Sequence, residues 1–200
     1  MRAKKTNTEI RKEQILLAAL KIIGSQGVNA LSIVGVAEKV GIVPSALYRH
    51  FSSKEEILDG ILDLMREKVL KNVQQARLKK HNALARLEFI MMRHLALLKE
   101  SRALPLILLS DAMYLGTSAR LSKIQEILES YLSALSAILK EGMEEGSIRA
   151  DIVPESTAIM FLGMILPAAV LVNVQAPFFN LESHAANVWP AFVRSIAVIN

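Results

Sequence analysis

Apolar residues recur at helical spacing along most of the chain, and short polar or glycine-containing breaks separate these stretches. The first such stretch begins near Thr8 and ends at Gly27, with one apolar stripe at i, i+3, i+4, i+7 and i+8. That stripe consists of Ile15, Ala18, Ala19, Ile22 and Ile23. Further helices are expected over 54–79, 81–99, 103–115, 118–142 and in two segments after Pro154. The pattern predicts an all-α protein with about nine helices in total.

Two much shorter helical patterns lie between Leu31 and Phe51 and are separated by Gly41. Ser32 is expected to cap the first, and Gly41 can adopt the left-handed backbone that ends a helix. Pro44 suits the first turn of the second helix, which directs Leu47 and Phe51 inward at a spacing of four residues. Two short helices joined by a tight glycine turn form a helix-turn-helix, whose second helix can enter a DNA major groove.

The stretch from Gly41 to Lys54, GIVPSALYRHFSSK, resembles the signature of the TetR family of bacterial transcriptional repressors. The resemblance covers roughly residues 10–58 and is most specific in LYRHF followed by SSKEE. It implies a three-helix DNA-binding domain over residues 1–55, with the helix-turn-helix at about 32–51. It also implies a larger helical domain for ligand binding and dimerisation over 56–200. The bland alternative is that Leu47 and Phe51 belong to an ordinary helical bundle and Tyr48 and His50 to its surface.

The same resemblance implies which residues contact DNA. Tyr48 and Lys54 are expected to bind phosphates, and Arg49 and His50 to contact backbone or base edges. Residues 43–46 are expected to lie deepest in the groove. The full expected set is Ser32, Val43, Pro44, Ser45, Ala46, Tyr48, Arg49, His50 and Lys54.

Several residues of the motif depart from the family pattern. Val43 stands where a capping Ser or Thr is common, and losing such a cap typically costs about 1 kcal/mol. Ser45 replaces a frequent Gly, and Val34 and Gly35 replace polar residues. Because Pro44, Ser45 and Ala46 are small, apolar contacts to thymine methyl groups and at most a few direct hydrogen bonds are expected.

The net charge is concentrated where the motif lies. Residues 1–55 hold nine Lys or Arg and four acidic residues, whereas the rest of the chain holds fifteen of each. The whole formal excess of +5 therefore coincides with the helix-turn-helix, which is typical of a surface that binds a polyanion. The basic run at the end of the 54–79 helix is instead expected to be a solvated surface.

Composition argues against several classes of function. The chain has no cysteine, and its four histidines are scattered without ligand-like spacing, so no metal site and no cofactor are expected. It has no Gly-rich phosphate loop and no Ser nucleophile motif, so no enzymatic activity is expected. The charged N-terminus does not resemble a secretory signal, and a cytoplasmic protein is expected.

The larger domain offers candidates for an apolar effector pocket, although the same apolar residues are compatible with a plain core. His94 lies on the apolar stripe of its helix and is either an ordinary buried histidine or a ligand contact. The candidate pocket residues are Met91, His94, Asp111, Tyr114, Tyr131 and Met164.

Residues 156–181 carry no charge and are long enough for a membrane span. Pro167, Asn173, Gln175 and Pro177 argue against a span, so we expect a helix that is buried on nearly all sides and no membrane partner. In the family that the chain resembles, the last two helices pair with a second copy. The candidate dimer residues are Phe161, Ile165, Trp189, Phe192 and Ile196.

Together these features predict a homodimeric, ligand-responsive repressor that binds a palindromic DNA operator. An unidentified apolar or amphipathic small molecule is expected to release it. The alternative is a basic helical protein that binds nucleic acid without sequence preference. The sequence does not identify the effector, the operator or the regulated genes. It is compatible with Pro167 and Pro190 either kinking or interrupting their helices.

Overall fold

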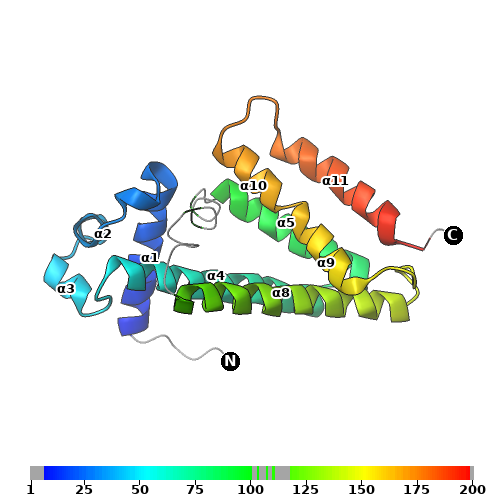
Figure 1. Ribbon diagram of the computed structural model, residues 1–200, viewed down its shortest axis with the longest axis horizontal. Helices are drawn as coiled ribbons and strands as arrows, with labels where there is room; N and C mark the ends of the chain where they lie inside the picture. Colours follow the sequence, from blue (N-terminus) through cyan, green and yellow to red (C-terminus); the bar gives the residue numbers. More distant parts are fainter. Residues whose placement is uncertain (1–6, 101–102, 104–106, 108–109, 111–117, 199–200) are drawn as a thin grey trace. The chain divides into compact units, whose positions relative to one another are not determined.

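The computed structural model describes residues 7–100, 103, 107, 110 and 118–198. Where described, the chain is helical apart from its turns and one isolated bridge between Ile148 and Ala197, so the all-α prediction is confirmed (Figure 1). Contacts divide it into two compact units, each described separately below. Unit 1 comprises residues 1–65 and 101–121, and unit 2 comprises residues 66–100 and 122–200.

Unit 1 contains the N-terminal helices α1 (Asn7–Gln26), α2 (Ile33–Val40) and α3 (Pro44–Tyr48), with a short 3-10 turn, η1 (Val28–Ala30), after α1. The predicted stripe of α1 is its buried side, and Ile15 and Ile23 have no exposed surface. Helix α2 contributes Val36 and Ala37 to the same core. The three-helix arrangement expected for residues 1–55 is therefore present.

Helix α4 (Lys54–Lys79) has the predicted bounds, but it belongs to both units. Its first part packs on α1 so closely that a Cβ on Gly60 would lie 3.0 Å from Leu16 Cδ2. Ile57 and Ile61 beside it are fully buried. The division between the two compact units falls inside α4, after Met65. The functional boundary expected between residues 55 and 56 stays a prediction.

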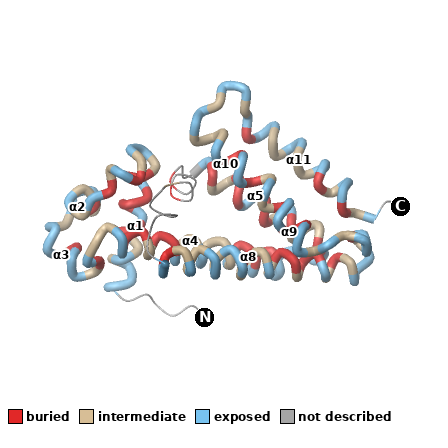
Figure 2. The backbone as a smooth tube through the Cα atoms, in the orientation of Figure 1, coloured by how far each residue is buried: buried red, intermediate tan, exposed pale blue. Residues whose placement is uncertain are grey.

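Unit 2 is built from the rest of α4 with α5 (Ala83–Glu100), α8 (Ser118–Glu144), α9 (Pro154–Gly163), α10 (Leu166–Asn173) and α11 (Leu181–Ile196). Only the first residues of α8 belong to unit 1. A continuous apolar core runs through unit 2 and includes Leu87, Ile90, Leu135, Ile138 and Phe161. Figure 2 shows the alternation of buried and exposed positions along these helices.

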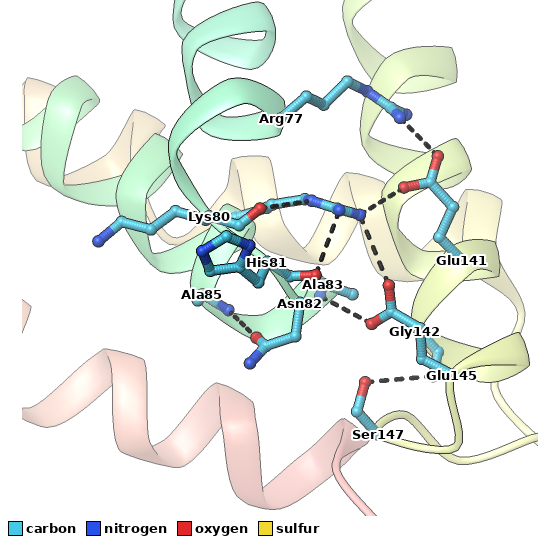
Figure 3. A network of polar contacts seen from close by, with 11 residues as sticks. Arg77, Lys80, His81, Asn82, Ala83, Ala85, Glu141, Gly142, Glu145 and Ser147 are labelled. Carbon is cyan, nitrogen blue, oxygen red and sulfur yellow. Dashed lines mark hydrogen bonds and ion pairs between the residues drawn. The ribbon is translucent and has the colours of Figure 1, made fainter.

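An ion-pair network ties the end of α4 to the start of α5 and the end of α8 (Figure 3). Arg77 Nη1 lies 2.6 Å from Glu141 Oε1, and Arg86 Nη1 lies 2.7 Å from Glu141 Oε2. Glu145 accepts a hydrogen bond from the Ala83 N–H and so caps α5. All of these residues belong to unit 2.

The uncharged segment after Pro154 forms two helices rather than one, because the chain turns at Met164 and Ile165. Pro167 stands in the first turn of α10, whereas Pro190 lies inside an otherwise continuous α11. By length and composition alone, Pro154–Asn173 meets the criterion for a membrane span, which is weak evidence, and 33% of it is buried. Within one subunit Ile159 and Val174 are more than 60% exposed, so burial of this segment on nearly all sides would require a further partner and stays a prediction.

Candidate nucleic-acid interface and effector site

The turn between α2 and α3 has the geometry that the sequence predicts. The Ser32 hydroxyl caps α2 by accepting a hydrogen bond from the Gly35 N–H at 3.1 Å. Gly41 ends the helix at φ 78° and ψ 37°, a left-handed conformation that favours glycine. Because the Ser32 hydroxyl accepts this bond, its own hydrogen stays available as a donor to an acceptor such as a phosphate oxygen.

Helix α3 presents the residues expected in the groove. Leu47 is fully buried and Phe51 is 5% exposed, so these two anchor the helix to unit 1. Val43 is 64% and Tyr48 55% exposed, and Pro44, Ser45 and Arg49 are also exposed. Val43 occupies the N-cap without a side-chain hydrogen bond, as its apolar side chain requires. Two large apolar side chains open to solvent are unfavourable in isolation, which fits a surface that contacts a partner.

The start of α4 is capped by residues of the short loop that follows α3. The Ser53 hydroxyl accepts from the Glu56 N–H at 3.1 Å, and the Glu56 carboxylate accepts from the Ser52 N–H at 2.6 Å. The Ser52 N–H and the Ser52 hydroxyl both donate to the Glu56 carboxylate, and these two bonds hold the pKa of Glu56 below its ordinary value. Lys54, in the first turn, is therefore carried on an ordered helix end.

Helix α1 contributes further residues beside the helix-turn-helix. Lys12 Nζ lies 5.6 Å from the centre of the Phe51 ring, a cation–π contact that ties α1 to the end of the motif. An open depression of about 380 Å³ is lined by Asn7, Thr8, Ile10, Arg11, Gln14 and His50. The Nδ1 atom of His50 is itself buried and has no hydrogen-bond partner. Only the tertiary packing of α1 brings these side chains to His50.

Two predicted pocket residues of unit 2 are in direct contact. His94 of α5 and Tyr131 of α8 are 9% and 4% exposed, and His94 Nε2 lies 2.5 Å from the Tyr131 hydroxyl. Their rings meet edge to face at 5.4 Å. Burial lowers the pKa of His94 to about 4 and raises that of Tyr131, so both are neutral at neutral pH. Which ring nitrogen of His94 carries the proton decides which partner donates.

The other predicted pocket residues are divided. Met91 is fully buried in the same core, and Met164 packs against that core from the turn between α9 and α10. The Met164 carbonyl lies 2.9 Å from His184 Nε2. Asp111 and Tyr114 lie outside the described residues.

The residues expected at a dimer interface are mostly internal. Phe161, Ile165, Phe192 and Ile196 are each at most 5% exposed within one subunit, and Trp189 is half-buried beside Phe192. Side chains that complete the core of a subunit are not a free surface, so the four buried assignments are not supported. The periodic pattern identified the apolar side of each helix correctly, and within one subunit that side packs into the core. The exposed apolar residues of these segments are Ile159, Met160, Leu166, Val170, Val174 and Phe178.

Two family models match the chain. The model of bacterial regulatory proteins of the tetR family matches residues 15–61, and the C-terminal region of YsiA-like proteins matches residues 63–194. The fatty acid metabolism regulator protein of Bacillus subtilis is 27% identical over 152 residues, covering 76% of this chain and 78% of that protein. The nucleoid occlusion factor SlmA of Vibrio campbellii is 28% identical over 140 residues, or 70% of each chain.

Solved structures agree with the family models. The transcriptional regulator FadR of Bacillus subtilis, in complex with stearoyl-CoA, has a TM-score of 0.72 and 25% identity, covering 90% of this chain and 97% of that one. A TetR-family regulator of Agrobacterium tumefaciens has a TM-score of 0.80 at 16% identity, covering 96% and 100%, which shows the fold. Given the two family matches and the helix-turn-helix geometry, the chain belongs to the tetR family of bacterial regulatory proteins and is a DNA-binding transcriptional regulator.

Proposed function

We propose that the protein is a cytoplasmic, homodimeric repressor that binds a near-palindromic operator and is released by an amphipathic molecule with a long acyl chain. The observation that carries the DNA-binding part is the arrangement of α3, where Leu47 and Phe51 are buried while Val43, Ser45 and Tyr48 are exposed. A two-fold dimer would present two such helices to successive major grooves.

The proposed interface extends from α3 to its neighbours. Lys54 and Tyr48 would bind phosphates beside the groove, and the Ser32 hydroxyl would donate a hydrogen bond to a third phosphate. Arg11 and His50, which line the depression at the start of α1, would accommodate a further phosphate, since Arg supplies several donors to one anion.

The effector proposal rests on the chemistry of unit 2. Its core is apolar except for a few groups, of which His94 and Tyr131 form a neutral, hydrogen-bonded pair. A long acyl chain would occupy apolar surroundings, and a carbonyl or hydroxyl group on the ligand would exchange hydrogen bonds with this pair. The relative from Bacillus subtilis whose structure contains stearoyl-CoA supports the choice of an acyl chain. A ligand releases DNA if it binds the DNA-incompetent conformation better than the competent one.

The first test is selection of bound duplexes from a random DNA pool by the purified protein, repeated with Tyr48→Ala. Enrichment of one palindrome by the wild type and not by the variant supports a dimeric operator-binding regulator. Salt-sensitive binding without enrichment would instead favour a charge-driven, sequence-independent nucleic-acid-binding protein.

The second test titrates stearoyl-CoA into the complex with the selected palindrome. Release at a concentration that also binds the free protein supports the acyl-chain effector. Palindrome binding that stearoyl-CoA leaves unchanged removes that effector class and leaves the DNA-binding proposal intact.

A further inference from the structure

One buried arginine joins the start of α8 to the start of α4. Arg120, the third residue of α8, has only 4% of its side chain exposed. Its Nε donates to Asp59 Oδ1 at 2.7 Å, and its Nη2 donates to the Glu55 carbonyl at 3.1 Å. One guanidinium therefore binds both a side chain and the main chain of the first turns of α4, and all three residues lie in unit 1.

The hydrogen bonds of Arg120 fix its orientation relative to Asp59 and Glu55 as well as its distance from them. A buried guanidinium is costly unless its donors are paired, so Arg120 strongly favours the conformation that keeps both partners in reach. Its planar fork also constrains direction, which a lysine ammonium would not. Glu55 directly follows Lys54, the predicted phosphate contact, and Asp59 lies one helical turn after Glu55. A shift of Arg120 would therefore also move the backbone next to Lys54.

Helix α8 also carries the candidate effector contact. Tyr131 lies eleven residues after Arg120, or about three helical turns further along the same helix. Near its other end, α8 is held to α4 again, by the Arg77–Glu141 ion pair within unit 2 (Figure 3). Along the sequence of α8, Tyr131 therefore lies between Arg120, which contacts α4 in unit 1, and Glu141, which contacts α4 in unit 2.

We propose that Arg120 is the positioning residue that couples effector binding at α8 to DNA binding. This inference rests on the proposed function, because it assumes an operator and an effector. Ligand contacts at Tyr131 would displace α8, and Arg120 would carry the displacement to Glu55 and Asp59 and so to Lys54. Coupling between two sites is reciprocal, so DNA binding must act back on α8 through the same residue.

The reciprocity gives a test that does not require the effector. Hydrogen exchange of the backbone amides in residues 122–131 is measured with and without the selected palindrome, in the wild type and in Arg120→Met. We expect DNA to change exchange in this stretch of the wild type and to leave it unchanged in the variant. Arg149→Met is the matched control, because it removes an exposed arginine of unit 2 whose partner is Asp151. That variant should respond like the wild type.

The outcomes separate the alternatives. A response in Arg120→Met equal to that of the wild type overturns the proposal, and so does a wild type whose residues 122–131 do not respond to DNA. If Arg120→Met no longer binds DNA, the comparison is made with Arg120→Lys, which retains a charge for Asp59 but lacks the fork that also reaches Glu55. A full response in that variant equally overturns the coupling role. Failure to select any palindrome refutes the proposed function itself, at an earlier step, and the coupling role with it.

A second measurement uses stearoyl-CoA as the probe. If it releases the wild type, its binding should weaken operator affinity by about 5- to 150-fold, the usual range for coupled sites. In Arg120→Met that factor should fall toward one while the affinity for stearoyl-CoA is retained. A variant that had merely lost structure would lose both. Release by stearoyl-CoA that is undiminished in Arg120→Met would contradict the coupling role.

Discussion

His94 and Tyr131 share a hydrogen bond of 2.5 Å between Nε2 and the phenol oxygen, in a core where almost every neighbour is apolar. The two residues come from α5 and α8 and are 37 positions apart in the chain. Each satisfies a polar atom of the other that the core could not otherwise satisfy, so the pair specifies how these two helices face one another.

Replacing both members of the pair should cost less than the sum of the two single replacements. Tyr131→Phe leaves the His94 ring nitrogen buried without a partner, and we expect a loss of about 1–3 kcal/mol in the free energy of unfolding. The double variant His94→Leu with Tyr131→Phe should be less destabilised than the sum of the two single variants. Urea denaturation of the four proteins measures this, and strict additivity would show that the bond contributes little.

The low pKa of His94 makes stability depend on pH in a defined window. Burial lowers this pKa from 6.5 to about 4, so below pH 6.5 the unfolded chain binds a proton that the folded chain does not. Stability is therefore fully present above the unfolded pKa and is lost as pH falls from 6.5 toward 4. Between pH 7.5 and 5.5 the expected loss is about 1.4 kcal/mol. In His94→Gln this component should disappear, and an unchanged pH profile would assign it to other groups.

Gly142 of α8 packs tightly against Ala83, at the start of α5, and against Ile148. A Cβ there would lie 2.7 Å from Ala83 Cβ and 2.5 Å from Ile148 Cδ1. Ile148 can move, but the Cβ of a helical alanine cannot, so Gly142→Ala should be destabilising by about 1–3 kcal/mol despite its better helix propensity. Thermal unfolding measures the effect. Gly163→Ala is the control, because its Cβ would have no neighbour within 4 Å, and it should be neutral or slightly stabilising.

The sequence predicts the local elements of this protein better than their partners. Ser32, Gly41 and Pro44 act through their own backbone geometry, so the helix-turn-helix could be predicted from a few adjacent residues. Apolar periodicity likewise predicted the bounds of α4 and the inward side of α1.

Contacts between distant segments carry no such local signal. Arg120 looks like an ordinary polar residue of α8 until Asp59 and Glu55 are placed beside it. For the same reason, Phe161 and Phe192 could be identified as buried but not as core residues of one subunit. An apolar stripe predicts which side of a helix is buried, but it does not predict which segment packs against that side.

Pairing of two copies should depend on the apolar residues that remain exposed on α9 and α10. Ile159 is 61% exposed and Val170 is 36% exposed. A contiguous patch of exposed apolar residues is typical of a surface that contacts another protein. We expect Ile159→Lys combined with Val170→Lys to shift the protein from dimer to monomer in sedimentation equilibrium. Leu78→Lys, at an 85% exposed site on α4, is the control and should leave the oligomeric state unchanged. A variant that stays fully dimeric would exclude this surface.

Lys54 and Val43 should affect DNA binding in different ways because they occupy different parts of the interface. If Lys54, at the start of α4, binds a phosphate as proposed, Lys54→Met should lower the affinity similarly for all sequences and the salt slope by about 0.9. Val43→Ser gains an N-cap worth about 1 kcal/mol but loses an exposed apolar side chain at the start of α3, so it should alter sequence preference. Binding to the selected palindrome, and to versions with one base pair changed, is measured by fluorescence anisotropy over a range of salt concentrations. Lys140→Met, which removes the same charge from unit 2, is the control and should behave like the wild type. If Lys54→Met altered preference among the sequences without changing the salt slope, Lys54 would be a base contact rather than a phosphate contact.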